Sequence, residues 1–316
     1  MTIVELKRTL QQSLSSIYQG DPTVVDYLLI LLVLGAHGLV EDVPGTGKTT
    51  LVKAFARLAG LTTKRVQGTP DLAPGDILGW AQYQPATGQI EYQDGPITTN
   101  ILLVDEINRA PPRTQSALLQ AMAEGSYMKL GQVTPLPDPF MVLATQNPIE
   151  FEGTFPLPEA QRDRFLIQFT LGYPDRDQEI KIMTMKNPEL SLEELKPILN
   201  AQHIKALRVQ LDKVHCDAKI LNWIRDLAEA SRKDGNLALG ISPRGTRMLY
   251  RAGLAKALLN GRTYVVPEDI SSLLVPVCQG RIILKPSAQA RGVTAKSVLE
   301  GLIGQVATPA LRGENS

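Results

Sequence analysis

The sequence predicts an α/β domain built on a five-stranded parallel sheet, followed by a smaller all-helical domain. In the first half of the 316-residue chain, short apolar runs of strand length alternate with helical patterns. Apolar runs of this length are typical of strands buried on both faces, as in a parallel sheet covered by helices. The five predicted strands are residues 38–40, 63–66, 101–104, 140–144 and 165–169.

The second domain is predicted from helix caps, because strand signals fade after Tyr173-Pro174. Asp175-x-x-Gln178 and Ser191-x-x-Glu194 each place a capping side chain three residues before a side chain that can answer it. Ser242-Pro243 predicts a further helix start, with serine as the cap and proline in the first turn. Apolar residues then recur every three or four positions until Gly261, which predicts one buried face.

Composition argues against several classes of protein. The formal net charge is +1 and no block of lysine or arginine stands out, so a nucleic-acid-binding face is not indicated. The two cysteines, Cys216 and Cys278, are far apart and form no metal or redox motif, which is typical of reduced packing residues in a cytoplasmic protein. Residues 1–20 are polar and lack the apolar core of a signal peptide. The most apolar stretch, residues 24–34, is far shorter than the ~20 residues of a membrane span, and it predicts a buried helix closed by Gly35.

A glycine-rich segment, Val43-Pro-Gly-Thr-Gly-Lys-Thr49, lies between the first predicted strand and a predicted helix. Backbone N–H groups in such a turn, together with the positive end of the following helix, form an anion site. Lys48 would reach the outer phosphates of a nucleotide, and the Thr49 hydroxyl would bind Mg²⁺. We therefore expect a nucleoside triphosphate, ATP with magnesium, to bind in this loop.

One position of this loop departs from the usual pattern. That pattern has glycine five residues before Gly47, where this chain has Asp42. Aspartate tolerates left-handed backbone better than most residues, so the turn can still form. A carboxylate near phosphates predicts a modest nucleotide affinity, and an Asp42→Gly substitution is expected to tighten it.

The run Ile101-Leu-Leu-Val-Asp105-Glu106 predicts a buried strand that ends in two carboxylates. Ligands of open α/β sheets bind at the carboxyl ends of the strands. We expect Asp105 to hold Mg²⁺ through water and Glu106 to polarise the attacking water, because phosphoryl transfer requires chiefly positioning and charge neutralisation. The alternative is a pair of solvated loop acids, which the preceding phosphate loop makes much less favourable.

Three further polar residues follow predicted elements. Asn147 ends the next strand, where an amide can orient the same water; the alternative is a simple Asn-Pro turn. Arg244 lies in the first turn of a capped helix, where a cation opposes the helix dipole by about 0.3–1 kcal/mol. A γ-phosphate would remove that penalty, and a surface pair with Asp or Glu is the alternative. Arg164 precedes the fifth strand, where it would either pair locally with Asp163 or Glu159 or extend as an arginine finger toward a neighbouring subunit's nucleotide.

Six segments together form a recognisable pattern. They are Pro70-Asp-Leu-Ala-Pro-Gly-Asp-Ile-Leu-Gly79, Asp105-Glu-Ile-Asn-Arg-Ala-Pro-Pro112, Thr114-Gln-Ser-Ala-Leu-Leu-Gln-Ala-Met122, Ala144-Thr-Gln-Asn-Pro-Ile-Glu150, Pro156-Leu-Pro-Glu-Ala160 and Ser242-Pro-Arg244. Through them the chain resembles the AAA+ ATPases, and within these the MoxR group, over nearly its whole length. The run from Ile101 to Pro112 is specific to few families.

The resemblance implies a role for each candidate residue. Lys48 and Thr49 match the Walker A motif, Asp105 and Glu106 Walker B, Asn147 sensor 1, Arg244 sensor 2, and Arg164 the arginine finger. The implied nucleotide-binding residues are Gly20, Pro44, Gly45, Thr46, Gly47, Lys48, Thr49, Thr50 and Asp105, with Gly20, Tyr18 and Gln19 on the adenine side; Thr49 and Asp105 are the implied magnesium ligands. Arg162 is a second candidate for the finger, and His37, which also matches a family position, is predicted to be structural.

The resemblance also implies a domain division and two insertions. The AAA+ P-loop core is predicted over residues 1–173 and a helical lid over residues 174–316. Hairpin insertions are expected near residues 75–95 and 127–139. The aromatic residues of the first insertion, Trp80, Tyr83 and Tyr92, would either grip a client polypeptide or pack on their own hairpin.

Similar proteins are ATP-driven, chaperone-like remodelling motors that act as rings and help to assemble or activate other complexes. The resemblance therefore implies a homo-oligomer, as a hexamer, with a protein client and a partner that carries a von Willebrand factor A-type domain, and a role that can extend to metal-cofactor insertion. The nearest alternative is a magnesium-chelatase-type motor subunit. A nucleic-acid motor is less favoured because no basic or aromatic stripe is visible. A non-catalytic, nucleotide-gated adapter is disfavoured by Glu106, Asn147 and Arg164.

Overall fold

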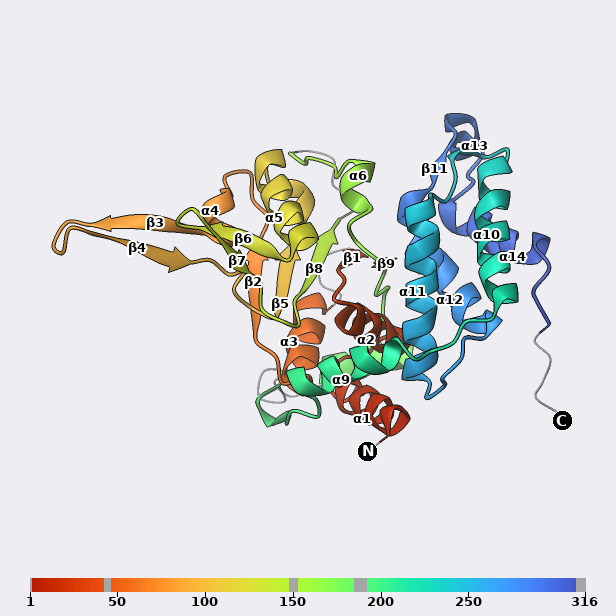
Figure 1. Cartoon of the computed structure of the whole chain (residues 1–316), viewed down its shortest axis with the longest axis horizontal. Helices are drawn as coiled ribbons and strands as arrows, with labels where there is room; N and C mark the ends of the chain where they lie inside the picture. Colours follow the sequence, from red (N-terminus) through yellow and green to blue (C-terminus); the bar gives the residue numbers. More distant parts are fainter. Residues whose placement is uncertain (1, 43–46, 148–152, 185–191, 311–316) are drawn as a thin grey trace.

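A parallel sheet with strand order β2-β5-β8-β1-β9 lies at the centre of the protein, which confirms the predicted five-stranded parallel sheet (Figure 1). The computed structural model describes residues 2–42, 47–147, 153–184 and 192–310. The strands of the sheet are β1 (Gly38–Glu41), β2 (Thr63–Gln67), β5 (Ile101–Asp105), β8 (Met141–Gln146) and β9 (Ile167–Phe169). Their carboxyl ends lie along one edge, because every pairing within the sheet is parallel.

Helices cover both faces of this sheet. They are α1 (Ile3–Ser15), α2 (Thr23–Leu34), α3 (Lys48–Leu58), α4 (Pro74–Leu78), the 3-10 turn η1 (Ile107–Arg109), α5 (Pro112–Glu124) and α6 (Glu159–Arg162). On β5, Ile101 and Leu103 pack into the cluster that includes α2 and α3, whereas Leu102 and Val104 pack into the cluster that includes α5. The uniformly apolar strand is therefore buried on both sides. Helix α2 ends at Gly35 as predicted, with a left-handed φ of 59°.

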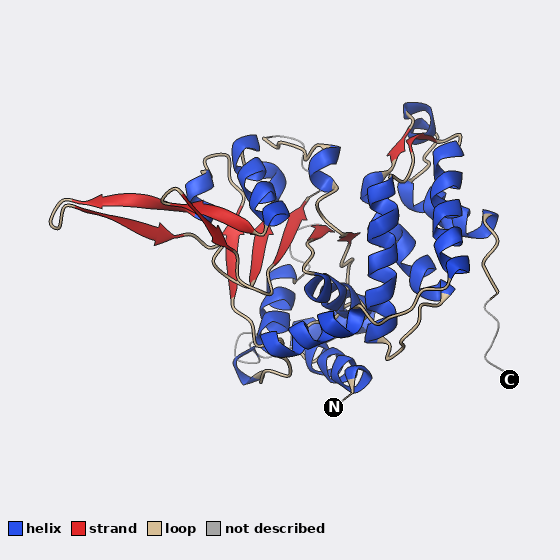
Figure 2. Cartoon of the chain, viewed as in Figure 1, coloured by secondary structure: helices blue, strands red, loops and turns tan. Residues whose placement is uncertain are grey.

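Two β-hairpins extend from this part of the chain, at the places expected for the insertions. β3 (Gly79–Gln84) pairs with β4 (Gln89–Asp94) and projects far from the body of the molecule (Figure 2). β6 (Ser126–Lys129) pairs with β7 (Gln132–Pro135). An ion pair of 2.7 Å joins Lys129, next to the turn of the second hairpin, to Asp94 at the base of the first.

The aromatic residues of the first hairpin differ in their surroundings. The Tyr92 hydroxyl donates to the Leu78 carbonyl at 3.1 Å, and Lys129 Nζ lies 5.0 Å from the centre of the Tyr92 ring. Trp80 and Tyr83 are 50% and 61% exposed. Tyr92 thus packs at the base of its own hairpin, whereas Trp80 and Tyr83 face solvent along the arm.

The second half of the chain is mainly helical, which confirms the predicted helical lid. Its helices are α7 (Arg176–Thr184), α9 (Ala201–Leu211), α10 (Ala218–Lys233), α11 (Pro243–Leu259), α12 (Pro267–Cys278), the 3-10 turn η2 (Gln279–Arg281), α13 (Pro286–Ala290) and α14 (Ala295–Gln305). The lid also contains a short antiparallel ladder, β10 (Leu237–Leu239) with β11 (Ile283–Leu284), so it is not helical throughout.

The predicted caps that fall within the described residues form. Asp175 and Gln178 cap each other's backbone N–H groups, at 2.8 and 2.9 Å. Ser242 Oγ accepts from the Gly245 N–H at 3.1 Å at the start of α11. The buried face of α11 includes Ala252, which has no exposed surface. The predicted cap at Ser191 lies outside the described residues.

The segment before the lid bundle runs back along the sheet domain. The backbone N–H groups of Ile198 and Leu199 donate to the Leu58 carbonyl at the end of α3, at 2.7 and 3.0 Å. The Arg208 guanidinium on α9 donates to the carbonyls of Leu32 and Val33 at the end of α2. Residues 198–211 therefore contact the first domain although they follow residue 173, and the boundary at 173 stays a prediction.

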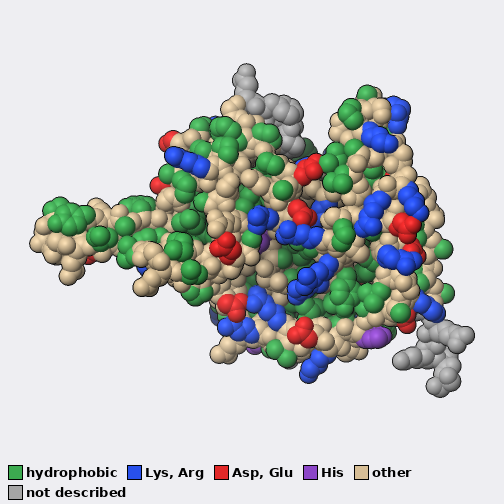
Figure 3. Space-filling model, turned by 45° about the horizontal axis from the view of Figure 1, so that its top comes forward, with side chains coloured by type: hydrophobic (Ala, Val, Ile, Leu, Met, Phe, Trp, Pro, Cys, Tyr) green, Lys and Arg blue, Asp and Glu red, His purple; other side chains and the backbone are tan. Residues whose placement is uncertain are grey.

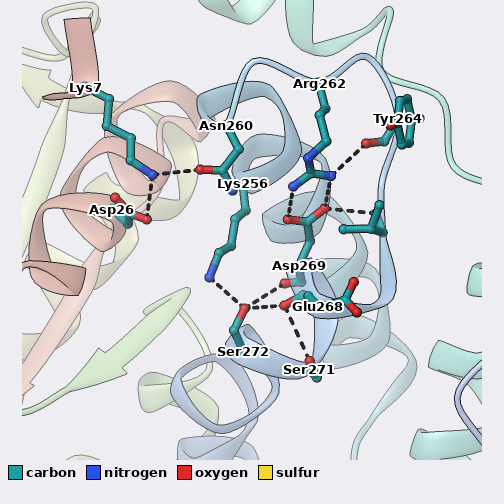
Figure 4. A network of polar contacts seen from close by, with 11 residues as sticks. Lys7, Asp26, Lys256, Asn260, Arg262, Tyr264, Glu268, Asp269, Ser271 and Ser272 are labelled. Atoms are coloured by element: carbon teal, nitrogen blue, oxygen red, sulfur yellow. Dashed lines mark hydrogen bonds and ion pairs between the residues drawn. The ribbon is translucent and has the colours of Figure 1, made fainter. Parts of the chain in front are cut away.

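The lid meets the first domain at a cluster of polar side chains that we call the Lys7 junction, formed by Lys7, Asp26 and Asn260 (Figure 4). Lys7 Nζ on α1 donates to Asp26 Oδ2 on α2 at 2.9 Å and to Asn260 Oδ1, at the end of α11, at 2.8 Å. Both members of the ion pair are largely buried, with side chains 16% and 15% exposed. This junction fixes α1 and α2 to the end of α11.

None of the helices in the described parts of the chain combines the length and apolar character that crossing a bilayer requires.

Candidate active site

A cavity of about 360 Å³ lies at the carboxyl-terminal edge of the sheet. It is lined by Asp42, Gly47, Lys48, Thr49, Thr50, Arg65, Gln67, Asp105, Glu106, Thr145 and Asn147. The predicted phosphate loop, the two acids after β5 and the amide after β8 therefore meet in one place, because parallel strands bring their carboxyl ends together.

The phosphate loop leads into α3. Gly47 precedes the helix with a φ of 81°, a left-handed conformation that favours glycine. The N-terminus of α3, with Thr49 and Thr50 in its first turn, therefore opens on the cavity, where its N–H groups favour an anion. Lys48 Nζ lies 3.4 Å from the carbonyl oxygen of Asp42. The predicted residues Pro44, Gly45 and Thr46 lie outside the described residues.

Asp42, the departure from the usual loop pattern, is 8% exposed and bound to backbone on two sides. Its N–H donates to the Gln146 carbonyl at 3.1 Å, and its carboxylate Oδ2 accepts from the Leu171 N–H at 3.1 Å. The carboxylate thus ties the end of β1 to the residues after β9, and it also lines the cavity. This bond gives Asp42 a structural task that the loop pattern did not reveal.

Asp105 is buried beneath the cavity and already contacts a cation. Arg65 Nε on β2 lies 2.5 Å from Asp105 Oδ2, and the Thr145 hydroxyl lies 3.4 Å from Asp105 Oδ1. Arg65, Gln67 and Thr145 were not among the residues predicted from the sequence. The signal for the first two was the alternation on β2, which puts residues 65 and 67 on one face beside the end of β5.

Glu106 is held by several contacts in a restricted backbone conformation. Its φ is 54°, left-handed for a non-glycine residue. Its Oε2 accepts from Gln67 Nε2 at 2.9 Å and pairs with Arg109 Nη1 at 3.2 Å, while its N–H donates to Thr145 Oγ1 at 2.9 Å. Gly68 passes so close that a Cβ there would lie 2.1 Å from the Glu106 carbonyl oxygen, so only glycine fits beside the catalytic candidate.

Two predicted arginines and Gly20 do not line this cavity. Arg244 Nε pairs with Asp163 Oδ2 at 3.2 Å, which is the local pairing that the sequence left open as an alternative. Arg164 is partly buried before β9, and within the described residues the structure shows no ion pair between it and Asp163 or Glu159. The backup candidate, Arg162, has a buried Nε without a hydrogen-bond partner in the described structure.

Gly20 lies beside the Tyr18 ring instead. A Cβ at Gly20 would come within 2.3 Å of the Tyr18 hydroxyl, and one at Gly47 would lie 3.9 Å from the same ring. Burial, together with the charges of Asp42 and Asp21, raises the pKa of Tyr18 to about 12. The Tyr18 ring thus lies near both Gly20 and Gly47, the last residue before α3.

His37 and the cysteines have structural surroundings. His37 Nδ1 accepts from the Val142 N–H at 3.0 Å, and its Nε2 lies 3.3 Å from the Met122 carbonyl. Burial lowers the pKa of His37 to about 4, so the ring is neutral at pH 7. Burial raises the pKa of Cys278 to about 12.

An arginine without a sequence signal, Arg281, joins the lid to the residues at the amino-terminal end of β9. Arg281 Nε lies 2.8 Å from Asp163 Oδ1, and Nη2 donates to the Phe165 carbonyl at 2.5 Å. Nη1 donates to the Leu166 carbonyl at 3.3 Å and also to that of Val277. The Arg281 side chain is 4% exposed. A buried arginine gives no periodic signal, so its role is visible only in the fold.

The residues that line the cavity are of the types that bind magnesium and a nucleoside triphosphate. Thr49 and Asp105 provide the hard oxygen donors that Mg²⁺ prefers, and Lys48 with the α3 N-terminus provides positive charge for phosphates. In this structure the Arg65 guanidinium pairs with Asp105 Oδ2 at the cavity wall. Figure 3 shows lysine and arginine side chains interspersed with acidic ones over the central part of the face that it draws.

Comparisons with known proteins agree with this geometry. A family model described as "ATPase family associated with various cellular activities (AAA)" matches residues 37–167, and one described as "AAA lid domain" matches residues 229–302. The chain is 40% identical to the YeaC protein of Bacillus subtilis over 95% of its length and 94% of the relative. It is 37% identical to the chaperone MoxR1 of Mycobacterium tuberculosis, over 92% of this chain and 79% of that protein.

A solved structure from Cytophaga hutchinsonii, provisionally described as an ATPase, superposes with a TM-score of 0.89 at 33% identity and covers 98% of this chain and 96% of that one. The fold, the strand-end cavity and these relatives lead to one conclusion: the chain belongs to the MoxR family of AAA+ ATPases.

Proposed function

We propose that this protein binds ATP with magnesium in the strand-end cavity and hydrolyses it to ADP and phosphate, which drives the remodelling of a partner protein. The observation that carries the proposal is the meeting of Lys48 and Thr49 with Asp105, Glu106 and Asn147 around one cavity. Phosphoryl transfer requires positioning and charge neutralisation, and these residue types supply both.

Each residue has a distinct task in this proposal. Lys48 and the N-terminus of α3 bind the outer phosphates. Thr49 and, through water, Asp105 would hold magnesium, which would neutralise phosphate charge. The Glu106 carboxylate accepts a hydrogen bond from the attacking water and so polarises it, and Asn147 orients that water. Because Gln67 and Arg109 hold the Glu106 carboxylate in this structure, those contacts must loosen for Glu106 to act on water.

Arg164 and Arg244 complete the proposed site from outside the cavity. Arg244 reaches the γ-phosphate when the lid approaches, and Arg164 enters the site of a neighbouring subunit as an arginine finger. The proposal therefore includes a homo-oligomeric ring, a hexamer, in the cytoplasm. A protein client belongs to the same proposal, and the relative named chaperone MoxR1 supports it. A partner with a von Willebrand factor A-type domain and a role in metal-cofactor insertion are proposed from the family resemblance alone.

Turnover measurements with two variants test the site. Lys48→Ala removes the cation of the phosphate loop and is expected to abolish nucleotide binding. Glu106→Gln is expected to bind Mg-ATP normally and to turn over very slowly, because an amide is a poor base. Wild-type affinity in the first variant, or wild-type turnover in the second, would contradict the assignment. Wild-type protein without turnover would instead favour a nucleotide-gated adapter.

The Glu106→Gln variant can also be used to identify the client protein. It should hold ATP without hydrolysis and keep clients bound, so proteins that co-purify with it in ATP, but not with Lys48→Ala, are the candidates. Porphyrin-dependent or single-stranded-DNA-dependent stimulation of turnover would favour the alternative motors.

A further inference from the structure

Asp163, which directly precedes Arg164 in the chain, forms ion pairs with two arginines of the lid, Arg244 and Arg281. Its two carboxylate oxygens have different partners: Oδ1 lies 2.8 Å from Arg281 Nε, and Oδ2 lies 3.2 Å from Arg244 Nε. Both arginines belong to the lid, on η2 and α11, whereas Asp163 lies between α6 and β9 next to Arg164. We call Asp163, Arg244 and Arg281 the Asp163 junction.

The two arginines are held to very different degrees. Arg281 is 4% exposed and also donates to the backbone carbonyls of Phe165 and Leu166, so it is fixed to the strand segment. Beside it, the Gln279 amide donates to the Gln168 carbonyl on β9 at 2.7 Å. Arg244 is 55% exposed. Arg281 is therefore the more firmly held member of the junction, and Arg244 is the less firmly held one.

The position of Arg244 on α11 favours pairing of its guanidinium with an anion. It lies in the first turn of α11, where the helix dipole disfavours a cation. The Asp163 carboxylate offsets that penalty in this structure, and a γ-phosphate would offset it in the ATP state. Asp163 also stays satisfied when Arg244 leaves, because Arg281 keeps its other oxygen paired.

We infer that Asp163 is a positioning residue that competes with the γ-phosphate for Arg244, and so sets how strongly the site prefers ATP over ADP. Departure of Arg244 also releases one of the two lid contacts to the carboxylate next to Arg164. Nucleotide binding in one subunit is thereby linked to the segment that contains Arg164, the proposed arginine finger for the neighbouring subunit's site. The inference rests on the proposed function, since it needs a nucleotide in the cavity.

The experiment compares the dissociation constants of AMP-PNP and ADP, each with Mg²⁺, by calorimetry on the full chain. Asp163→Asn removes the competing charge, so AMP-PNP should bind about two- to five-fold more tightly, which corresponds to the strength of a partly exposed ion pair. ADP, which lacks the γ-phosphate, should bind as in the wild type. Asp163→Glu keeps the charge and should restore the wild-type ratio of the two constants.

Two controls isolate the cause. In an Arg244→Ala background, Asp163→Asn should no longer change the ratio, because the shared cation is gone. Asp26→Asn removes the carboxylate of the Lys7 junction and should leave the ratio unchanged. If Asp163→Asn fails to fold, the double variant Asp163→Asn/Arg281→Met removes both members of the buried pair and carries the same expectation for AMP-PNP.

Each outcome decides a different question. An unchanged ratio, weaker AMP-PNP binding, or an equal shift for both nucleotides in Asp163→Asn overturns the inference. Absence of nucleotide binding in the wild type, or binding that survives Lys48→Ala, overturns the proposed function instead. Nucleotide binding that depends on Lys48, with an unchanged ratio in Asp163→Asn, leaves the function standing and removes only the competition.

Discussion

Two of the polar junctions between the lid and the sheet domain use the same chemistry in different ways. At the Lys7 junction, a lysine of α1 lies between a carboxylate of α2 and an amide at the end of α11. At the Asp163 junction, a carboxylate before β9 lies between two arginines of the lid. The Lys7 junction contains no residue of the proposed site, whereas the Asp163 junction contains Arg244 and adjoins Arg164.

The two junctions differ in how firmly their charged side chains are held. A cation such as Lys7, largely buried between two acceptors, has little reason to change partner. A carboxylate with one buried and one exposed arginine can lose the exposed one at low cost. We therefore expect changes at the Lys7 junction to alter stability, and changes at the Asp163 junction to alter nucleotide use as well.

The largest effect is expected at Arg164, beside the second junction. Arg164→Ala should bind ATP yet lose roughly 10³-fold or more in turnover, the usual contribution of an arginine finger. Steady-state phosphate release at saturating ATP measures this, with Lys7→Met as the comparison that keeps its turnover. An Arg164→Ala protein with wild-type turnover would make the position a local structural arginine.

Mixing inactive subunits tests whether Arg164 acts on a neighbour. Arg164→Ala and Glu106→Gln are each expected to be inactive, for different reasons. In an equal mixture, roughly one interface in four pairs an intact Glu106 with an intact Arg164, so activity should return to on the order of a quarter of wild type if sites act independently. Recovery above both parents is the required result. If subunits exchange and no activity returns, Arg162 becomes the next candidate.

The next largest effect is expected at Arg281. Arg281→Met should lower the free energy of unfolding by about 3 kcal/mol, because it leaves Asp163 without its buried partner and several carbonyls without a donor. Urea unfolding measures the loss, and Arg281→Lys, which keeps the charge but not the planar fork, should fall between the two. A smaller loss than that of Lys7→Met would reverse the ranking of the two junctions.

Much of this fold was accessible from the sequence, because its signals are local. The run from Ile101 to Val104 is apolar throughout and became the strand buried on both faces. Ser242-Pro243 marked the start of α11, and Gly35 marked the end of α2. The ladder between β10 and β11 was not predicted, since strands of two and three residues carry too little pattern.

The candidate site divides in the same way. Lys48, Thr49, Asp105, Glu106 and Asn147 line one cavity because each lies at the end of a predictable strand or the start of a predictable helix. Arg65, Gln67 and Arg281 were missed because their importance depends on which chain segment lies opposite. Arg281 meets Asp163 across 118 residues of sequence, a contact that no local pattern encodes.

Asp42 extends the comparison to a third carboxylate, which follows the end of β1. Its Oδ2 holds the Leu171 N–H, so Asp42→Gly would remove a fold contact together with the charge. Asp42→Asn separates the two, because the amide oxygen can still accept that bond. We expect Asp42→Asn to tighten ATP binding by up to about ten-fold, since a like charge at the cavity wall costs on the order of 1 kcal/mol. Unchanged binding with unchanged stability would mean that the carboxylate acts on the fold alone.

The smallest effect is expected at the Lys7 junction, and it is the one that could undo the comparison. Lys7→Met and Asp26→Asn should each lower the free energy of unfolding by about 1 kcal/mol, because each removes the largely buried ion pair between the two side chains. The double variant should lose less than the sum, by about 0.5 kcal/mol, since the two side chains share one contact. Turnover per folded protein and the ratio of AMP-PNP to ADP affinity should stay at their wild-type values in all three. A shift in that ratio comparable to the one expected for Asp163→Asn would mean that both junctions respond to nucleotide, and that the lid moves as one rigid body against α1 and β9 together.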